Sequence, residues 1–138
     1  MERLSIVLKK LREDKKYTIE ELARKAGIGK GTVGDIETGK SRSTVKTLNK
    51  ISSALELDQE EKDRLFSAFL GRKISNVATN EKVEKLNKRE RIQYEDFMND
   101  AILYFQDERV SEEDKQKLFN SLQEAFFTIK IANKKKGD

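Results

Sequence analysis

The sequence predicts an all-α fold, with five helices followed by a C-terminal helical hairpin. The chain has 138 residues and no proline, the residue that most often interrupts a helix. Apolar residues recur at helical spacing along almost the whole chain, and no run alternates β-branched with polar residues as a strand does. We therefore expect helices throughout.

Two helices are expected before residue 27. The first begins at Leu4 and ends near residues 15–16, since its apolar residues recur every three or four positions. The second runs to Ala26. Thr18 is its predicted N-cap, and Glu21, three residues later, completes a capping box.

Three further helices are expected before the hairpin. A short helix covers about residues 30–37 and ends at Gly39, a glycine in the left-handed C-cap region. The next helix begins near Thr44. Asp58 caps the fifth helix, which ends near Gly71.

The remainder of the chain has two parts. Residues 74–91 combine few large apolar groups with many charges, which predicts a mobile linker or an exposed helical extension between a domain at 1–73 and the C-terminal region. Residues 92–134 carry two apolar helical faces joined near 107–110, with Ser111 starting the second helix. This pattern predicts an αα-hairpin.

Composition excludes several classes of protein. The chain has no cysteine and no histidine, which removes disulfides, thiolate chemistry, the usual zinc sites and the usual general base, so any catalysis would need carboxylates or lysines alone. We expect no metal and no cofactor, and an enzyme is the weakest of the function classes considered. The mean hydropathy is −0.79, and no apolar run is long enough for a bilayer. Without a signal-peptide pattern at its start, the protein is expected in the cytoplasm, associated with the nucleoid and not with a membrane.

The positive charge is concentrated in the first half of the chain. Residues 1–73 contain 17 Lys and Arg against 12 Asp and Glu, a net +5, whereas residues 74–138 contain 12 against 13, a net −1. A basic excess of this kind is either a solvated helical surface or part of a nucleic-acid-binding face.

One segment carries the strongest functional signal. The apolar period of residues 19–26 stops at Gly27 and restarts with Val33 and Ile36 after one tight turn. Two short helices that cross at a glycine turn leave the second exposed along one side, which suits it to the major groove of DNA.

A family pattern runs through the same segment. Its matching positions are Thr18, Glu20, Glu21, Leu22, Ala23, Gly27, Ile28, Thr32, Val33, Ile36, Glu37 and Gly39, followed by Thr47, Leu48, Ile51, Ala54 and Leu55. On these residues the chain resembles the Xre/Cro-like phage-repressor family of DNA-binding domains, over roughly its first 57 to 70 residues. The resemblance implies a sequence-specific transcriptional regulator, a repressor that binds double-stranded DNA as a dimer at a palindromic operator.

The resemblance also implies site residues. Base contacts are expected from the first turns of the third helix, at Lys30, Gly31, Thr32 and Asp35. Phosphate contacts are expected from Thr18, Lys40, Arg42, Thr44 and Lys46. Arg12 and Glu37 stand where the family often makes a structural ion pair. For Asp35, a solvent-facing residue repelled by phosphates is an equal alternative.

Four positions depart from the family pattern. Ile19 replaces the usual Gln, Gly29 replaces the usual Ser or Thr, and Gly31 and Gly34 lie inside the third helix. Each interior glycine costs roughly 1 kcal/mol relative to alanine and leaves bare backbone. We therefore expect few direct base contacts supplemented by duplex shape. Weak DNA binding, or a surface used for a protein, is the alternative.

Two sequence patterns of phosphate-binding loops also occur, but we expect neither to bind a nucleotide. Residues 29–34 satisfy G-x-G-x-x-G, and residues 34–41 satisfy G-x-x-x-x-G-K-S. Each pattern binds phosphate only where a buried parallel strand leads into the loop, and here helices are expected on both sides.

The hairpin carries most of the aromatic residues: Tyr94, Phe97, Tyr104, Phe105, Phe119, Phe126 and Phe127. Two helices alone are not expected to bury so much ring area, so a third surface is predicted. A second copy of the chain is the first candidate, through Phe97, Ile102, Phe105, Phe119, Leu122 and Phe126. The alternatives are packing on the fifth helix in a monomer, and binding of a regulatory protein or peptide, as in an antitoxin or anti-repressor with an autoregulatory DNA-binding domain.

Overall fold

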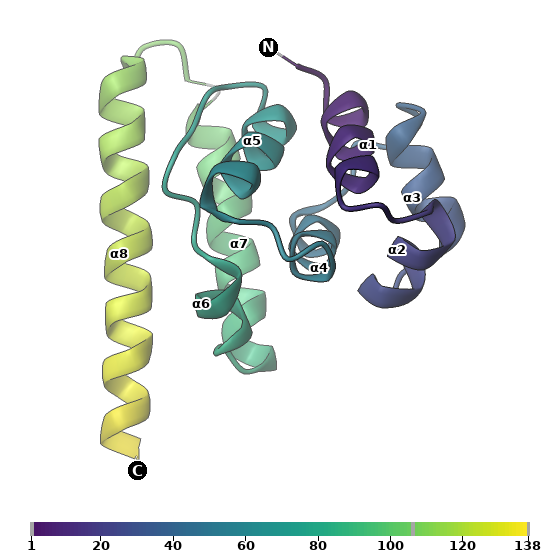
Figure 1. Cartoon of the computed structure of the whole chain (residues 1–138). Coiled ribbons are helices and arrows are strands. Elements are labelled where there is room, and N and C mark those ends of the chain that lie inside the picture. Colours follow the sequence, from purple (N-terminus) through teal and green to yellow (C-terminus); the bar gives the residue numbers. More distant parts are fainter. Residues whose placement is uncertain (1, 106, 138) are drawn as a thin grey trace. The chain divides into compact units, whose positions relative to one another are not determined.

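The computed structural model describes residues 2–105 and 107–137, except for the side chains of Ile102, Tyr104 and residues 129–137. Over these ranges it contains eight helices and no strand, which confirms the predicted all-α class (Figure 1). The chain divides into two compact units, Met1–Ser75 and Asn76–Asp138, called here the N-terminal and C-terminal units.

The N-terminal unit contains the five expected helices. They are α1 (Leu4–Asp14), α2 (Ile19–Ala26), α3 (Lys30–Glu37), α4 (Val45–Ala54) and α5 (Gln59–Leu70). Helix α1 packs against α3 and α5, and α2 packs against α3 and α4. Each helix turns most of its apolar residues inward, so that side chains such as Leu8, Leu22 and Leu48 have no exposed surface.

Local sequence chemistry sets the helix ends. The Thr18 hydroxyl accepts from the Glu21 amide, and the Glu21 carboxylate accepts from the Thr18 amide, so the predicted capping box is confirmed. Asp58 and Glu61 form a second capping box at the start of α5. Gly27 ends α2 with a φ of 70°, a left-handed conformation that glycine adopts at little cost.

The C-terminal unit contains α6 (Asn80–Glu84), α7 (Lys88–Phe105) and α8 (Glu112–Gly137). Helices α7 and α8 pack as a hairpin, and the Ser111 hydroxyl accepts from the Asp114 amide at the start of α8, as expected for its N-cap. At the other end of the joining loop, the buried ammonium of Lys115 donates to the Phe105 carbonyl at 2.9 Å. This bond satisfies a carbonyl at the end of α7.

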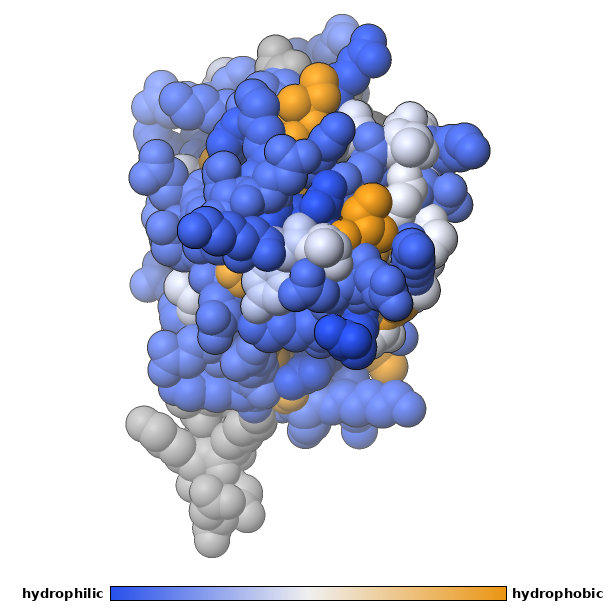
Figure 2. Space-filling view, turned by 45° about the vertical axis from the view of Figure 1, so that its right-hand side comes forward, coloured by the Kyte–Doolittle hydropathy of each residue, from blue (hydrophilic) through white to orange (hydrophobic). Residues whose placement is uncertain are grey.

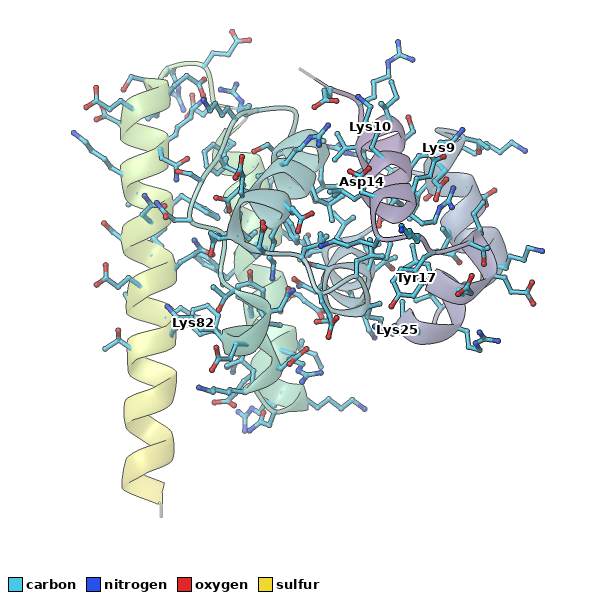
Figure 3. All side chains as sticks on the ribbon, in the orientation of Figure 1. Lys9, Lys10, Asp14, Tyr17, Lys25 and Lys82 are labelled. Atoms are coloured by element: carbon cyan, nitrogen blue, oxygen red, sulfur yellow. The ribbon has the colours of Figure 1, made fainter. Side chains whose placement is uncertain are left out.

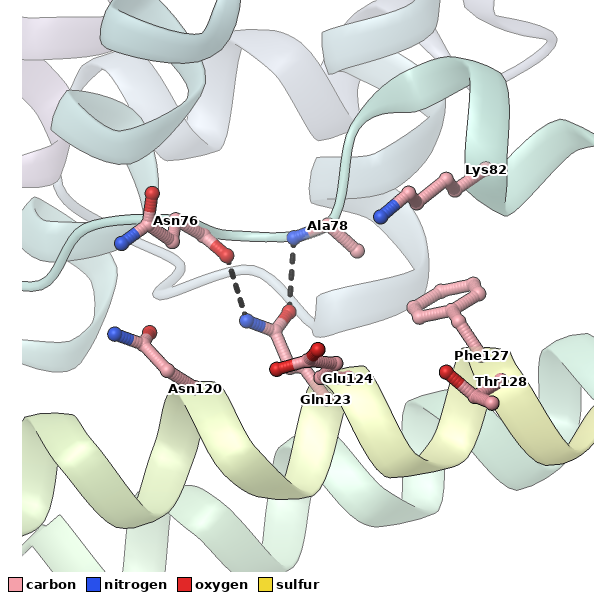
Figure 4. A pocket seen from close by; sticks show the side chains of 8 residues that line it. All are labelled: Asn76, Ala78, Lys82, Asn120, Gln123, Glu124, Phe127 and Thr128. Carbon is pink, nitrogen blue, oxygen red and sulfur yellow. Dashed lines mark hydrogen bonds between the residues drawn. The ribbon is translucent and has the colours of Figure 1, made fainter.

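Residues 74–91, for which a mobile linker or an exposed helical extension is predicted, contain several buried apolar side chains. The side chains of Val77, Val83 and Leu86 are buried. The Gln123 carboxamide of α8 accepts from the Ala78 amide at 2.8 Å and donates to the Asn76 carbonyl at 2.7 Å (Figure 4). The Gln123 carboxamide thus ties the start of this segment to α8.

The aromatic residues of the hairpin pack mainly on one another. Phe97 stacks on Phe119 and Phe126, with ring centroids 6.5 and 6.0 Å apart, and Phe105 meets Phe119 at 5.5 Å. Phe105 and Phe119 are each only 2% exposed, whereas Leu122 is 44% exposed. Among the residues expected to meet a partner, these two rings lie inside the hairpin, and Ile102 is outside the described side chains. Mutual ring packing thus buries part of the apolar area for which the sequence predicted a third surface.

The remaining surface is hydrophilic on the face drawn in Figure 2, where hydrophobic residues form small separate patches. Within the described residues, no helix combines the length and the apolar character needed to cross a bilayer. No group of three or more Asp or Glu residues suited to a metal ion occurs within these residues either.

Candidate DNA-binding surface

The short helix α3 has one buried and one exposed face. Val33 and Ile36 are buried against the unit, at 0% and 1% exposure. Lys30, Thr32 and Asp35 are exposed. The residues expected to contact bases thus share the outward face of α3, which the glycine turn at Gly27 brings out beside α2.

Two glycines leave part of this helix bare. A Cβ atom built on Gly31 or on Gly34 would meet no atom within 4 Å. Both lie in the interior of α3, where glycine lowers helix stability. By contrast, Gly39 has a φ of 80°, so its backbone favours glycine. The fold of the described residues therefore gives a reason for Gly39 but none for Gly31 or Gly34.

The start of α3 also lacks a side-chain cap. Gly29 is the N-cap, and no side chain there accepts a hydrogen bond from the helix. The Gly29 carbonyl accepts from the amides of Thr32 and Val33. The first amides of a helix attract anions when no side chain occupies them, so this end of α3 suits a phosphate oxygen.

An ion pair fixes the other end of α3. The Arg12 Nε and Nη2 atoms donate to the two Glu37 carboxylate oxygens at 2.7 and 2.9 Å, and Nη1 donates to the Tyr17 carbonyl at 2.8 Å. The two side chains are 11% and 6% exposed. The hydrogen bond to Glu37 raises the pKa of Arg12. The expected pair is present, and it joins α1, the loop before α2 and the end of α3.

The phosphate candidates differ in what else they bind. Thr18 and Thr44 both cap helices, since their hydroxyls accept from the Glu21 and Thr47 amides. A capping hydroxyl that accepts a hydrogen bond still has a hydrogen to donate. Within the described residues the Thr18 hydroxyl donates to no protein group, so it suits a phosphate. The Thr44 hydroxyl already donates to the Thr47 hydroxyl at 3.2 Å.

The basic candidates follow α3 in the chain. Lys40 and Lys46 are exposed. Arg42 is held by α5: its Nη2 donates to the Phe69 carbonyl at 3.1 Å, and its guanidinium carbon lies 5.4 Å from the centre of the Phe69 ring. An arginine has five N–H groups, so Arg42 keeps donors for a phosphate while also supporting the fold.

A further pair near α2 was not identified from the sequence. The Lys25 ammonium donates to the Tyr17 hydroxyl at 2.7 Å and lies 5.2 Å from the centre of its ring (Figure 3). Tyr17 precedes the α2 N-cap, and Lys25 lies in the last turn of that helix. The two residues are eight positions apart, a spacing that no local helical pattern predicts.

The two crossing helices, the glycine turn and the outward face of α3 define the class of DNA-binding helix-turn-helix domains. Residues 8–60 match a family model described as helix-turn-helix. These residues are a helix-turn-helix domain of the Cro/C1 type, which is Xre-like, so the resemblance found in the sequence is confirmed. No curated protein and no solved structure matches the chain.

Proposed function

We propose that the chain is a transcriptional repressor that occupies a palindromic operator as a homodimer. The Cro/C1-type domain at residues 8–60 supports DNA binding. A bound dimer blocks polymerase by its presence, and no bond is made or broken. Two copies related by a two-fold axis match two half-sites about one duplex turn apart.

In this proposal the outward face of α3 lies in the major groove. Lys30 donates to the O6 and N7 atoms of guanine, Thr32 meets a thymine methyl group or a phosphate, and Asp35 accepts from a cytosine amino group. Gly31 lets the backbone approach the base edges closely. Thr18, Lys40, Arg42, Thr44 and Lys46 bind the phosphates on either side.

The observation that carries the proposal is the bare part of α3. Gly31 and Gly34 weaken the helix, and apart from the neighbouring backbone of α3 the described residues place no atom within 4 Å of a Cβ there. A close-fitting external surface is a physical reason for both glycines, and DNA in the major groove is such a surface for a Cro/C1-type domain.

The test is selection of bound duplexes from a random library by the full chain at low ionic strength. The proposal expects enriched sites with two inverted half-sites, and affinity that falls steeply with salt as counterions are released. Enrichment of a single half-site without an inverted repeat would contradict the dimer, and no retained duplex at all would contradict DNA binding.

A further inference from the structure

The flank of α8 carries an exposed apolar stripe. Leu118 is 39% and Leu122 is 44% exposed, and Ala125 is exposed as well. The spacing of four and then three residues places them on one side of the helix, as in the contact seam of paired helices. On α7, the exposed Ile92 and Leu103 form no such stripe, because the polar residues of the intervening turns separate them.

The two ends of α8 carry opposite charge. Its first turn contains the acidic residues Glu112, Glu113 and Asp114. Its last turn contains Lys134, Lys135 and Lys136. The exposed stripe lies between these two ends, so the sequence of α8 runs from a negative end through an apolar middle to a positive end.

We propose that α8 pairs with α8 of a second copy in an antiparallel arrangement, about a two-fold axis that passes between Leu122 and Ala125. The axis lies midway between the acidic turn and the lysine turn, so each acidic turn faces the partner's lysine turn. A parallel pair would set like charges against each other. The inference rests on the homodimer of the proposed function and names its interface.

Cysteine cross-linking tests the direction of the pair, because the chain contains no cysteine of its own. Ala125→Cys places two thiols next to the axis, where oxidation links the copies. Asp114→Cys, four residues before Leu118 and on the same side of the helix as the stripe, places them roughly 30 Å apart along an antiparallel pair at 1.5 Å per residue. We expect a cross-linked dimer from the first variant and none from the second. Cross-linking of both would indicate a parallel pair and would overturn the proposal.

Charge reversal tests the role of the helix ends. Reversing the acidic turn (E112K, E113K and D114K together) is expected to weaken dimerisation at least about tenfold, since lysines then face lysines. Adding K134E, K135E and K136E restores opposite charges across an antiparallel pair and is expected to restore the dimer. The original charges also favour an isolated helix through its dipole. If the helix dipole alone were responsible, the variant with all six substitutions would not recover dimerisation, because its charges oppose the dipole at both ends of α8.

The apolar stripe is tested by Leu122→Glu, with Leu103→Glu as the matched control on α7. Sedimentation equilibrium of the full chain should give monomers for the first variant and dimers for the control, with unchanged helical circular dichroism in both. If Leu122→Glu loses its helical signal, the Ala125→Cys cross-linking result decides whether α8 forms the interface.

If the parent protein is a dimer but Ala125→Cys does not cross-link, the α8 interface is contradicted and the proposed repressor function is not. A monomeric parent contradicts both the proposed homodimer and the α8 interface. DNA retention, measured separately, tests the DNA-binding function alone.

Discussion

Arg12 on α1 and Glu37 at the end of α3 form a two-point ion pair, with N to O distances of 2.7 and 2.9 Å and little exposure to solvent. The pair holds the C-terminal end of α3 against α1, whereas the N-terminal end has no side-chain cap. The position of α3 therefore depends on this contact and on the buried Val33 and Ile36.

Arg12→Ala is expected to lower the free energy of unfolding by about 3–5 kcal/mol, because it leaves the Glu37 carboxylate buried and unpaired. Urea denaturation followed by circular dichroism measures the loss. Lys10→Ala is the control. It removes an exposed ion pair with Glu2, which solvent screens, and should cost much less. Equal losses in the two variants would show that burial of the Arg12 pair has no energetic consequence.

Gly31→Ala and Gly34→Ala are expected to stabilise the protein and weaken DNA binding. Each added methyl group meets open space and gains up to about 1 kcal/mol of helix propensity. The same methyl group would collide with a closely seated duplex. Thermal unfolding and DNA titration measure the two effects on one sample.

The control for these glycines is Gly39→Ala, which is expected to destabilise the protein because the residue has a φ of 80°. Variants of Gly31 and Gly34 that are more stable and still bind DNA like the parent would show that α3 makes no close approach at these positions.

Helix ends and the helix-turn-helix could be predicted because their causes are local. Thr18 and Glu21 are three residues apart, and a capping box needs only that spacing. The apolar period that stops at Gly27 and restarts at Val33 is likewise a local pattern, so the helix-turn-helix can be predicted without knowledge of distant residues. Arg12 and Glu37 are 25 positions apart, so spacing does not predict that they pair. That pair was predicted from the resemblance to a family.

The C-terminal unit was harder to predict because its contacts are distant in sequence. Gln123 bonds the backbone 45 and 47 positions earlier, a contact without any repeating pattern. Val77 stands mostly among polar residues and Val83 among charged ones in the sequence, so no local pattern predicts that both are buried. The packing of Phe105 on Phe119 likewise depends on how the two hairpin helices are rotated about their axes.

Lys30→Ala and Lys40→Ala are expected to affect DNA binding differently. Loss of a base contact at Lys30 should lower the discrimination at one operator position by about 1–3 kcal/mol. Loss of a phosphate contact at Lys40 should weaken binding to all sequences and reduce the salt slope by about 0.9. Titrations with matched and mismatched duplexes at several salt concentrations measure both. A uniform loss in Lys30→Ala would reassign that lysine to a phosphate.

Arg42→Ala is expected to combine two effects. It removes a cation proposed to bind a phosphate, and it also removes the hydrogen bond and ring contact with Phe69 on α5. Weaker DNA binding should therefore accompany a lower thermal midpoint, whereas Lys40→Ala should leave that midpoint unchanged. An unchanged midpoint in Arg42→Ala would indicate that its contact with Phe69 contributes nothing to stability.

The loop between α7 and α8 contains a carboxylate with a low pKa. Hydrogen bonds from the Arg109 side chain and then from its backbone amide lower the pKa of Asp107 from 3.8 to about 2. The folded state thus favours the charged form, so its stabilising effect is complete above pH 3.8 and is lost as the pH falls through about 2. Arg109→Ala should raise this pKa in an NMR titration of the carboxyl carbon. A pKa that does not move would exclude the arginine as the cause.

Tyr94→Phe is expected to leave the free energy of unfolding unchanged or to raise it by up to about 1 kcal/mol. The Tyr94 hydroxyl is fully buried, and within the part of the chain that the structure describes it has no hydrogen-bond partner. Burial also raises its pKa, because the phenolate would lose its hydration without gaining a donor. Tyr17→Phe makes the same chemical change where the hydroxyl accepts from Lys25, and it should lower stability slightly. Urea denaturation of both variants compares them, and a marked loss in Tyr94→Phe would mean that its hydroxyl is bonded in solution.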